Sequence, residues 1–296
     1  MRDTRRRLSP SDGRDDLTTH KLLYYPGCTA AKAAQDDAPV RAVLKLLDVD
    51  FAEVPDWTCC GALFPLCDDV VALLEPARNL VCVSKAGQEV VMSCPFCYNT
   101  LKRTNKLIKE DSEIREKLAT YMEEPYDGRV KVLHFLEFIR DRVGFKELEK
   151  RLKVKLNGLK VAPLYGCMLL RPPEEMMLDD PERPRILDDL LVSLGSEVID
   201  YSYKTKCCGS YLSTNLPDVV DDCVKRILDS AKERGAEAVA TTCALCHFNL
   251  DTRGGQLPVF CASQLLAIGL GAGHEVCRFD LHRVDPLPLL KDRGIL

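Results

Sequence analysis

The chain has 296 residues, of which 46% are hydrophobic and 29% are charged, a composition typical of a globular protein with one large or two small domains. Its net charge of −4 gives no reason to expect nucleic acid or an anionic membrane surface as the main partner. No apolar run reaches the roughly 18 residues that a membrane-spanning helix requires, so the sequence predicts no such helix.

The first residues, "MRDTRRRLSPSDGRDD", are charged and are followed by no apolar stretch, so we expect neither a secretory nor a twin-arginine signal. Residues 1–18 are therefore predicted to be a disordered extension, and the protein is predicted to be cytoplasmic. The chain contains 15 cysteines. In a reducing compartment such a number favours metal binding or redox chemistry over a disulfide framework.

In the first half, each cysteine segment follows a predicted strand. The apolar residues 22–27 read as a strand that ends in a loop before Cys28. Residues 39–56 show a helical period and then an alternating, strand-like run into Cys59 and Cys60. The short apolar segment 89–93 predicts a buried strand that ends at "CPFC" (94–97), and a predicted helix begins there. A further strand and helix are expected over 130–139, and a helical stretch over about 106–152.

The second half repeats this order. Cys167 follows the apolar segment 162–166, Cys207 and Cys208 follow a helical and then strand-like run over 184–203, and "CALC" (243–246) ends a short apolar segment. Strands that alternate with helices predict an α/β fold of two pseudo-symmetric tandem modules, each with a small, mostly parallel sheet flanked by helices. The cysteines should gather at the strand ends, where open α/β sheets place their sites. We expect an N-terminal module over 19–157 and a C-terminal module over 158–296.

Each half offers five thiols, one more than a tetrahedral zinc site or an ordinary cubane cluster uses. Adjacent side chains in extended backbone point to opposite sides, so two neighbouring cysteines can share one ligand only if the backbone turns sharply. Gly61 and Gly209 directly follow the two pairs and permit such a turn. From the residues alone, three interpretations remain: an iron–sulfur cluster, one zinc ion per half, or a cluster-free dithiol relay.

The motifs "YYPGC", "DWTCCGA", "SCPFCYN", "YKTKCCG" and "CALCHFNLD" strongly resemble the CCG (cysteine-rich domain) family, and within it the B-type subunits of heterodisulfide reductases. The resemblance runs from about residue 21 to residue 285. It implies one non-cubane [4Fe-4S] cluster with five cysteine ligands in each half, with one cluster plus zinc as the alternative. The implied ligands are Cys28, Cys59, Cys60, Cys94 and Cys97 for the first cluster and Cys167, Cys207, Cys208, Cys243 and Cys246 for the second.

The resemblance also implies a reaction. In this family the disulfide CoM-S-S-CoB, or a related substrate, lies between the two clusters, and each cluster supplies one electron and takes up one sulfur at iron. Cys60 and Cys208 are the residues that we expect beside those irons. The implied partners in a heterodisulfide reductase-type complex are a ferredoxin-like iron–sulfur subunit, which carries ordinary [4Fe-4S] clusters, and a flavin subunit. The resemblance also fits the reverse reaction, in which two thiols are oxidised to a disulfide.

A different function fits the same motifs. CCG subunits also occur in relatives of succinate and fumarate reductases and in sulfur-oxidation complexes. There such a subunit relays electrons or anchors its partners in a flavin-linked oxidoreductase.

Several residues outside the ten cysteines are candidates for the substrate or for the surroundings of the clusters. Arg171, Lys204 and Lys206 flank the second cysteine set and suit an anionic substrate. His247, next to Cys246, is a candidate hydrogen-bond donor to cluster sulfur. Cys261 stands where many relatives have a histidine, and we expect it to be a small buried residue. The remaining cysteines, Cys67, Cys82, Cys223 and Cys277, are expected to be structural thiols.

Overall fold

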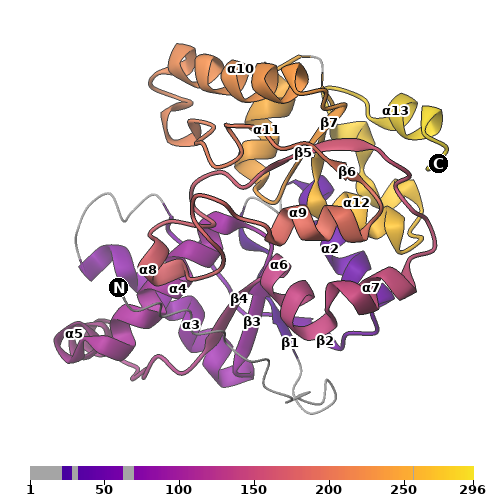
Figure 1. Ribbon diagram of the computed structural model, residues 1–296. Helices are drawn as coiled ribbons and strands as arrows, with labels where there is room; N and C mark the ends of the chain where they lie inside the picture. Colours follow the sequence, from indigo (N-terminus) through magenta and orange to yellow (C-terminus); the bar gives the residue numbers. More distant parts are fainter. Residues whose placement is uncertain (1–21, 29–32, 63–69, 256) are drawn as a thin grey trace, which may run out of the picture.

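The computed structural model describes residues 22–28, 33–62, 70–255 and 257–296 (Figure 1). The extension predicted over residues 1–18 and the thiol of Cys67 lie outside the described residues.

The N-terminal part of the chain forms a four-stranded sheet in which every described strand pair is parallel. Its strands are β1 (Leu22–Tyr24), β2 (Phe51–Glu53), β3 (Glu89–Met92) and β4 (Lys131–His134), in the order β2-β1-β3-β4. The helices of this part are α2 (Ala34–Leu46), α3 (Leu74–Ala86), α4 (Pro95–Glu110), α5 (Ser112–Met122), α6 (Phe135–Phe138) and α7 (Phe145–Arg151), with a 3₁₀ turn η2 (Val70–Leu73) and a π-helical turn η3 (Ile139–Val143).

The C-terminal part repeats this topology. Its strands are β5 (Lys160–Leu164), β6 (Glu197–Val198), β7 (Ala238–Thr241) and β8 (Val259–Cys261), all paired in parallel in the order β6-β5-β7-β8. Its helices are α8 (Pro173–Met176), α9 (Ile186–Ser193), α10 (Pro217–Glu233), α11 (Ala244–Arg253), α12 (Ala262–Gly269) and α13 (Leu287–Asp292), with 3₁₀ turns η4 (Ser210–Leu212), η5 (His274–Cys277) and η6 (Phe279–Leu281).

The predicted fold of two pseudo-symmetric α/β modules is therefore confirmed. The central strands are continuous apolar runs because helices cover the sheet faces, and all four residues of β7 are buried. Helix α10 shows the opposite pattern, with Val220, Val224 and Ile227 buried along one face and charged side chains on the other. In both sheets the second strand of the unit lies at one edge, so the two units have the same strand order.

The two units pack closely against each other. Helix α2 of the first unit lies beside α12 of the second (Figure 1). Asn99 on α4 is 1% exposed, and its Nδ2 donates to the carbonyl oxygens of Met168 at 2.8 Å and Arg171 at 2.6 Å. This single amide ties the segment after Cys167 to the N-terminal unit, so it fixes where one cysteine loop lies relative to the other unit.

Replacing Asn99 with alanine should therefore destabilise the protein. The Asn99→Ala variant leaves two carbonyls without their donor, and we expect the free energy of unfolding to fall by about 1–3 kcal/mol. Urea denaturation followed by circular dichroism measures the loss. The matched control is Asn215→Ala, because Asn215 is exposed and its side chain bonds only to the adjacent Thr214. Equal stability of the two variants would contradict the structural role of Asn99.

Candidate metal centres

The first five thiols meet at the carboxyl edge of the N-terminal sheet, and we call them the N-terminal thiol set. They are Cys28 after β1, Cys59 and Cys60 after β2, and Cys94 and Cys97 at the junction of β3 and α4. The Cys28 and Cys59 sulfurs are 3.4 Å apart. Further contacts join Cys59 to Cys60, Cys60 to Cys97, and Cys97 to Cys94. The five sulfurs thus form one continuous row.

The C-terminal thiol set has the same arrangement after β5, β6 and β7. Cys167 lies 3.7 Å from Cys207 between sulfurs, and Cys246 lies 3.2 Å from Cys208. Cys207 contacts Cys208, and Cys246 contacts Cys243. The row Cys167-Cys207-Cys208-Cys246-Cys243 matches the N-terminal row position by position, although the sequence spacing of the two sets differs.

In both sets the loop that precedes the thiols runs close against one of them. Gly27 has φ of +71°, and a Cβ added there would lie 2.8 Å from the Cys97 sulfur. Gly166 has φ of +68°, and its added Cβ would lie 3.3 Å from the Cys246 sulfur. Glycine is required at these positions both by the left-handed backbone and by the closeness of the thiols. Five soft sulfur donors gathered in this way fit an iron–sulfur group.

The contacts within each row lower the pKa of one thiol and raise the pKa of its neighbour. The pKa of Cys59 is lowered to about 5, first because the Cys60 thiol donates to it and then because the Gly61 N–H does. The pKa of Cys207 is lowered to about 2 by the Cys167 and Cys208 thiols, and the pKa of Cys208 is raised to about 11 by the same contact. Cys59 and Cys207 are also exposed. Each set therefore presents one thiolate to solvent.

Tyr211 connects the two sets. It follows the second double cysteine by three residues, and its hydroxyl donates to the carbonyl oxygen of Ala62, at 3.4 Å, just after the first double cysteine. Its ring packs on Phe96, between Cys94 and Cys97, with ring centroids 5.1 Å apart. Burial, and then the charges of Cys167 and Cys60, raise the pKa of the Tyr211 phenol. The two thiol sets therefore face each other across the module interface.

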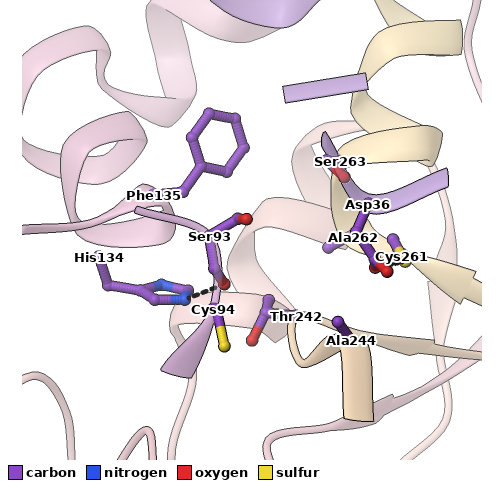
Figure 2. Close-up of a pocket in the computed structure, with 10 residues that line it drawn as sticks. All are labelled: Asp36, Ser93, Cys94, His134, Phe135, Thr242, Ala244, Cys261, Ala262 and Ser263. Atoms are coloured by element: carbon purple, nitrogen blue, oxygen red, sulfur yellow. Dashed lines mark hydrogen bonds between the residues drawn. The ribbon is translucent and has the colours of Figure 1, made fainter. Parts of the chain in front are cut away.

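A small cavity also lies at this interface, and Figure 2 shows that residues of both modules line it. Its volume of about 20 Å³ suffices for one water molecule. Cys94 and Thr242 point into it from the ends of β3 and β7. Beside it the Cys261 thiol donates to Asp36 Oδ1 at 2.6 Å, and both residues are buried. Cys261 is small and buried as expected, and it also contacts an acid from the other module.

The other sequence candidates lie in different surroundings. Arg171 donates to Glu182 at 2.5 Å, and one of its guanidinium nitrogens is buried without a partner among the described residues. Lys206 is exposed. His247 is 1% exposed, and its Nε2–H donates to the carbonyl of Val259 at 3.0 Å, so its imidazole faces β8.

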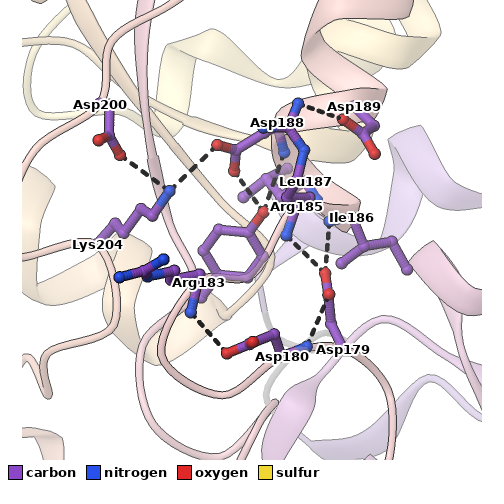
Figure 3. A network of polar contacts seen from close by, with 11 residues as sticks. Asp179, Asp180, Arg183, Arg185, Ile186, Leu187, Asp188, Asp189, Asp200 and Lys204 are labelled. Carbon is purple, nitrogen blue, oxygen red and sulfur yellow. Dashed lines mark hydrogen bonds and ion pairs between the residues drawn. The ribbon is translucent and has the colours of Figure 1, made fainter. Parts of the chain in front are cut away.

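Lys204 belongs to a partly buried polar network that Figure 3 shows. Its ammonium group lies 3.3 Å from Asp188 and 2.9 Å from Asp200, while the Tyr165 hydroxyl donates to Asp188. Tyr165 comes two residues before Cys167, and its backbone N–H donates to the Lys204 carbonyl at 2.8 Å. The network thus holds in place the backbone that leads into Cys167 and into Cys207. The positive charge of Lys204 is already paired with two carboxylates.

The sequence analysis did not identify the contacts of Asp36 and Tyr211 between the two modules. Only Asp36 carried a usable signal, because it shares a helical face with the buried Val40 and Val43. Cys82 and Cys223 lie on α3 and α10, and Cys277 is buried beside Gln264. Among the residues that the structure describes, no three His, Cys, Asp or Glu side chains converge on the position of one metal ion, since the five thiols of each set lie in a row. No described helix is long and apolar enough to cross a membrane.

Comparison with known proteins supports this description. The family model of the cysteine-rich domain CCG matches residues 22–102 and 161–251. The B-type subunit of the ferredoxin:CoB-CoM heterodisulfide reductase of Methanosarcina mazei is 27% identical over 290 residues, covering 92% of this chain and 96% of the relative. The 8-methylmenaquinol:fumarate reductase membrane anchor subunit of Wolinella succinogenes is 27% identical over 266 residues, covering 85% and 92%.

A solved structure shares the fold. The crystal structure of a hypothetical protein from Helicobacter pylori superposes with a TM-score of 0.71 at 10% identity, over 89% of this chain. This chain spans about half of that protein, 52% of its length.

The lowered pKa of Cys59 predicts that, in the metal-free protein, its alkylation rate depends on pH differently from that of Cys223. With a pKa of about 5, Cys59 is a thiolate throughout roughly pH 6–8, so its rate with iodoacetamide should stay flat, because the thiolate is the nucleophile. Burial raises the pKa of Cys223, so its rate should rise about tenfold per pH unit. Pulse labelling with peptide mass spectrometry measures both rates. A tenfold rise per unit at Cys59 would refute the predicted acidity.

Proposed function

This chain belongs to the CCG cysteine-rich domain family, and we propose that it is the iron–sulfur subunit of a heterodisulfide reductase-type complex. Its reaction is the reduction of a disulfide, CoM-S-S-CoB or a related substrate, or the reverse. The proposal agrees with the name of the Methanosarcina relative, which is similar over nearly the full length of both chains.

One observation carries the proposal: Tyr211 contacts Ala62 and Phe96, so the cysteine motifs of the two modules face each other. A disulfide has two sulfurs, and its reduction to two thiols takes up two electrons and two protons. Two sites that face one another can each receive one sulfur and deliver one electron. Two sites on opposite surfaces could not share one disulfide in this way.

We propose that the modules 19–157 and 158–296 each hold one non-cubane [4Fe-4S] cluster through their five thiols. A row of five sulfurs suits a group with several metal atoms, and glycine at positions 27 and 166 keeps side chains from pressing on the Cys97 and Cys246 sulfurs. When bound, such clusters would supply the electrons and the iron that takes up sulfur. Cys60 and Cys208, buried at 2% exposure each in the middle of their rows, would hold the irons nearest the substrate.

The remaining parts of the proposal concern charge and partners. Arg171 has a buried nitrogen without a partner among the described residues, so we propose that it contacts an anionic group of the substrate, with Lys206 at the exposed side. His247 is proposed to act on the second cluster only through its backbone position beside Cys246. The electrons would come from a flavin subunit through a ferredoxin-like iron–sulfur subunit, and the complex is proposed to be cytoplasmic.

A second function is favoured by one comparison. The Wolinella relative has the same identity, and its name assigns it to a fumarate reductase as membrane anchor subunit. In this alternative the two thiol sets would relay electrons within a flavin-linked oxidoreductase, and no disulfide would be cleaved.

Metal analysis tests the cluster assignment. Anaerobically purified protein should contain about eight irons and about eight acid-labile sulfides per chain, four for each cluster. Cys60→Ser and Cys208→Ser should each lower both values toward about four, whereas Cys223→Ser should leave them unchanged. About four irons in the wild type, or zinc in place of iron, would refute the two-cluster assignment.

Disulfide reduction separates the two functions. With reduced methyl viologen as the electron donor, the wild type should reduce CoM-S-S-CoB, and either Cys60→Ser or Cys208→Ser should lower the rate at least about tenfold, because each removes one of two required sites. Thiol release measures the rate, with Cys223→Ser as the control. Full iron content without disulfide reduction in the wild type would favour the relay.

A further inference from the structure

The two thiol sets differ in the donors that surround their central cysteine. The Ser210 hydroxyl lies 3.1 Å from the Cys208 sulfur. Asn249 Nδ2 lies 3.2 Å from Ser210 Oγ and 3.7 Å from the Cys208 sulfur. When the sulfur is a metal-bound thiolate it carries no proton, so the hydroxyl and the amide must be the donors.

This arrangement is built into the fold. Asn249 is 1% exposed on α11, and Ser213 Oγ lies 3.5 Å from its Oδ1, which orients the amide so that its NH₂ group points to Ser210. An amide that donates to Ser210 Oγ leaves the hydroxyl proton free for Cys208. The Gly209 backbone N–H adds a third donor, to the Cys207 sulfur at 3.3 Å.

The N-terminal set has neither the serine nor the asparagine at the equivalent positions. Ala62, two residues after Cys60, stands where the second module has Ser210, and it has no hydrogen to donate. Thr100, three residues after Cys97, stands in place of Asn249. Both sets share the backbone donor, since the Gly61 N–H reaches Cys59 as the Gly209 N–H reaches Cys207.

The buried amide of the first module has a different task. Asn79 is 1% exposed, and its Nδ2 donates to the carbonyl of Glu75 at 3.0 Å and lies 3.5 Å from the carbonyl of Cys59. It orders the backbone and does not reach the sulfur. The neighbouring Thr58 hydroxyl donates to the Glu75 carboxylate at 2.7 Å, and Arg78 pairs with the same carboxylate at 3.0 Å.

We propose that Ser210 and Asn249 are positioning residues that give the C-terminal cluster a higher reduction potential than the N-terminal cluster. This inference rests on the proposed function, since it requires a cluster in each module. Hydrogen bonds to ligand sulfur stabilise the extra negative charge of the reduced state and therefore raise the reduction potential. Each reduction takes up one electron, and no bond to the protein forms or breaks.

The difference in reduction potential sets the order in which the two clusters take up electrons. The first electron delivered to the protein resides at the C-terminal set, beside Cys208, and the N-terminal set, beside Cys60, is the stronger reductant. The two halves of a repeated fold would thereby act in sequence on one disulfide.

Redox titration of the complete chain, followed by electron paramagnetic resonance, tests the inference. The wild type should show two midpoint potentials. In Ser210→Ala, which introduces the residue of the first module, the higher potential should fall, corresponding to about a tenfold loss in the equilibrium constant for one-electron reduction, or about 59 mV. Asn249→Thr should shift the same potential in the same direction. In both variants the lower potential should stay constant.

Two further variants complete the experiment: one introduces the second module's serine into the first module, and the other is a control. Ala62→Ser should raise the lower potential and leave the higher one unchanged. Thr214→Ala is the matched control, because its hydroxyl contacts only the adjacent Asn215, and it should move neither. Eight irons per chain with coinciding midpoints, or with midpoints that Ser210→Ala and Asn249→Thr do not shift, would overturn this inference alone. Four irons in the wild type would overturn the proposed function, and this inference with it.

Discussion

The crowding of five sulfurs at one edge of each parallel sheet is the constraint on which the rest of the structure depends. All strands of such a sheet end at the same edge, so loops that are distant in sequence emerge side by side. The thiols can meet there only if the first loop leaves them space, and this is why Gly27 and Gly166 have left-handed backbone directly beside Cys97 and Cys246. The double cysteines and their glycines then complete each row.

The repeated topology does not make the two modules chemically equal. His134 and Cys261 occupy the same place, at the end of the last strand and the start of the following helix. The His134 ring bonds to the Ser93 carbonyl within its own module at 2.9 Å, whereas the Cys261 thiol reaches Asp36 in the other module. A shorter side chain at the second position therefore leaves space for an acid from α2, and the interface acquires a contact that the repeat alone would not produce.

The sequence predicted the features that follow from order along the chain. Strand, cysteine and helix recur at intervals that identify the fold, the ten thiols and their place at the strand ends. Features that depend on side-chain direction could not be predicted. His247 follows Cys246 directly, yet successive residues of a helix point about 100° apart, so its ring faces β8. Lys204 has the charge expected of a substrate contact, but only the folded structure shows that Asp188 and Asp200 neutralise it.

If the two thiol sets share one substrate, as proposed, the distance between them must be fixed. Three polar contacts at separate places in the module interface hold that distance. Asn99 holds the segment after Cys167 against α4, Tyr211 joins the two loops that follow the double cysteines, and Cys261 bonds to Asp36 below them. These contacts come from α4, η4 and β8, so the modules are held together at separated points, and a hinge motion at any one would strain the others. The rigidity of the pair then follows from polar contacts that neither module could satisfy by itself.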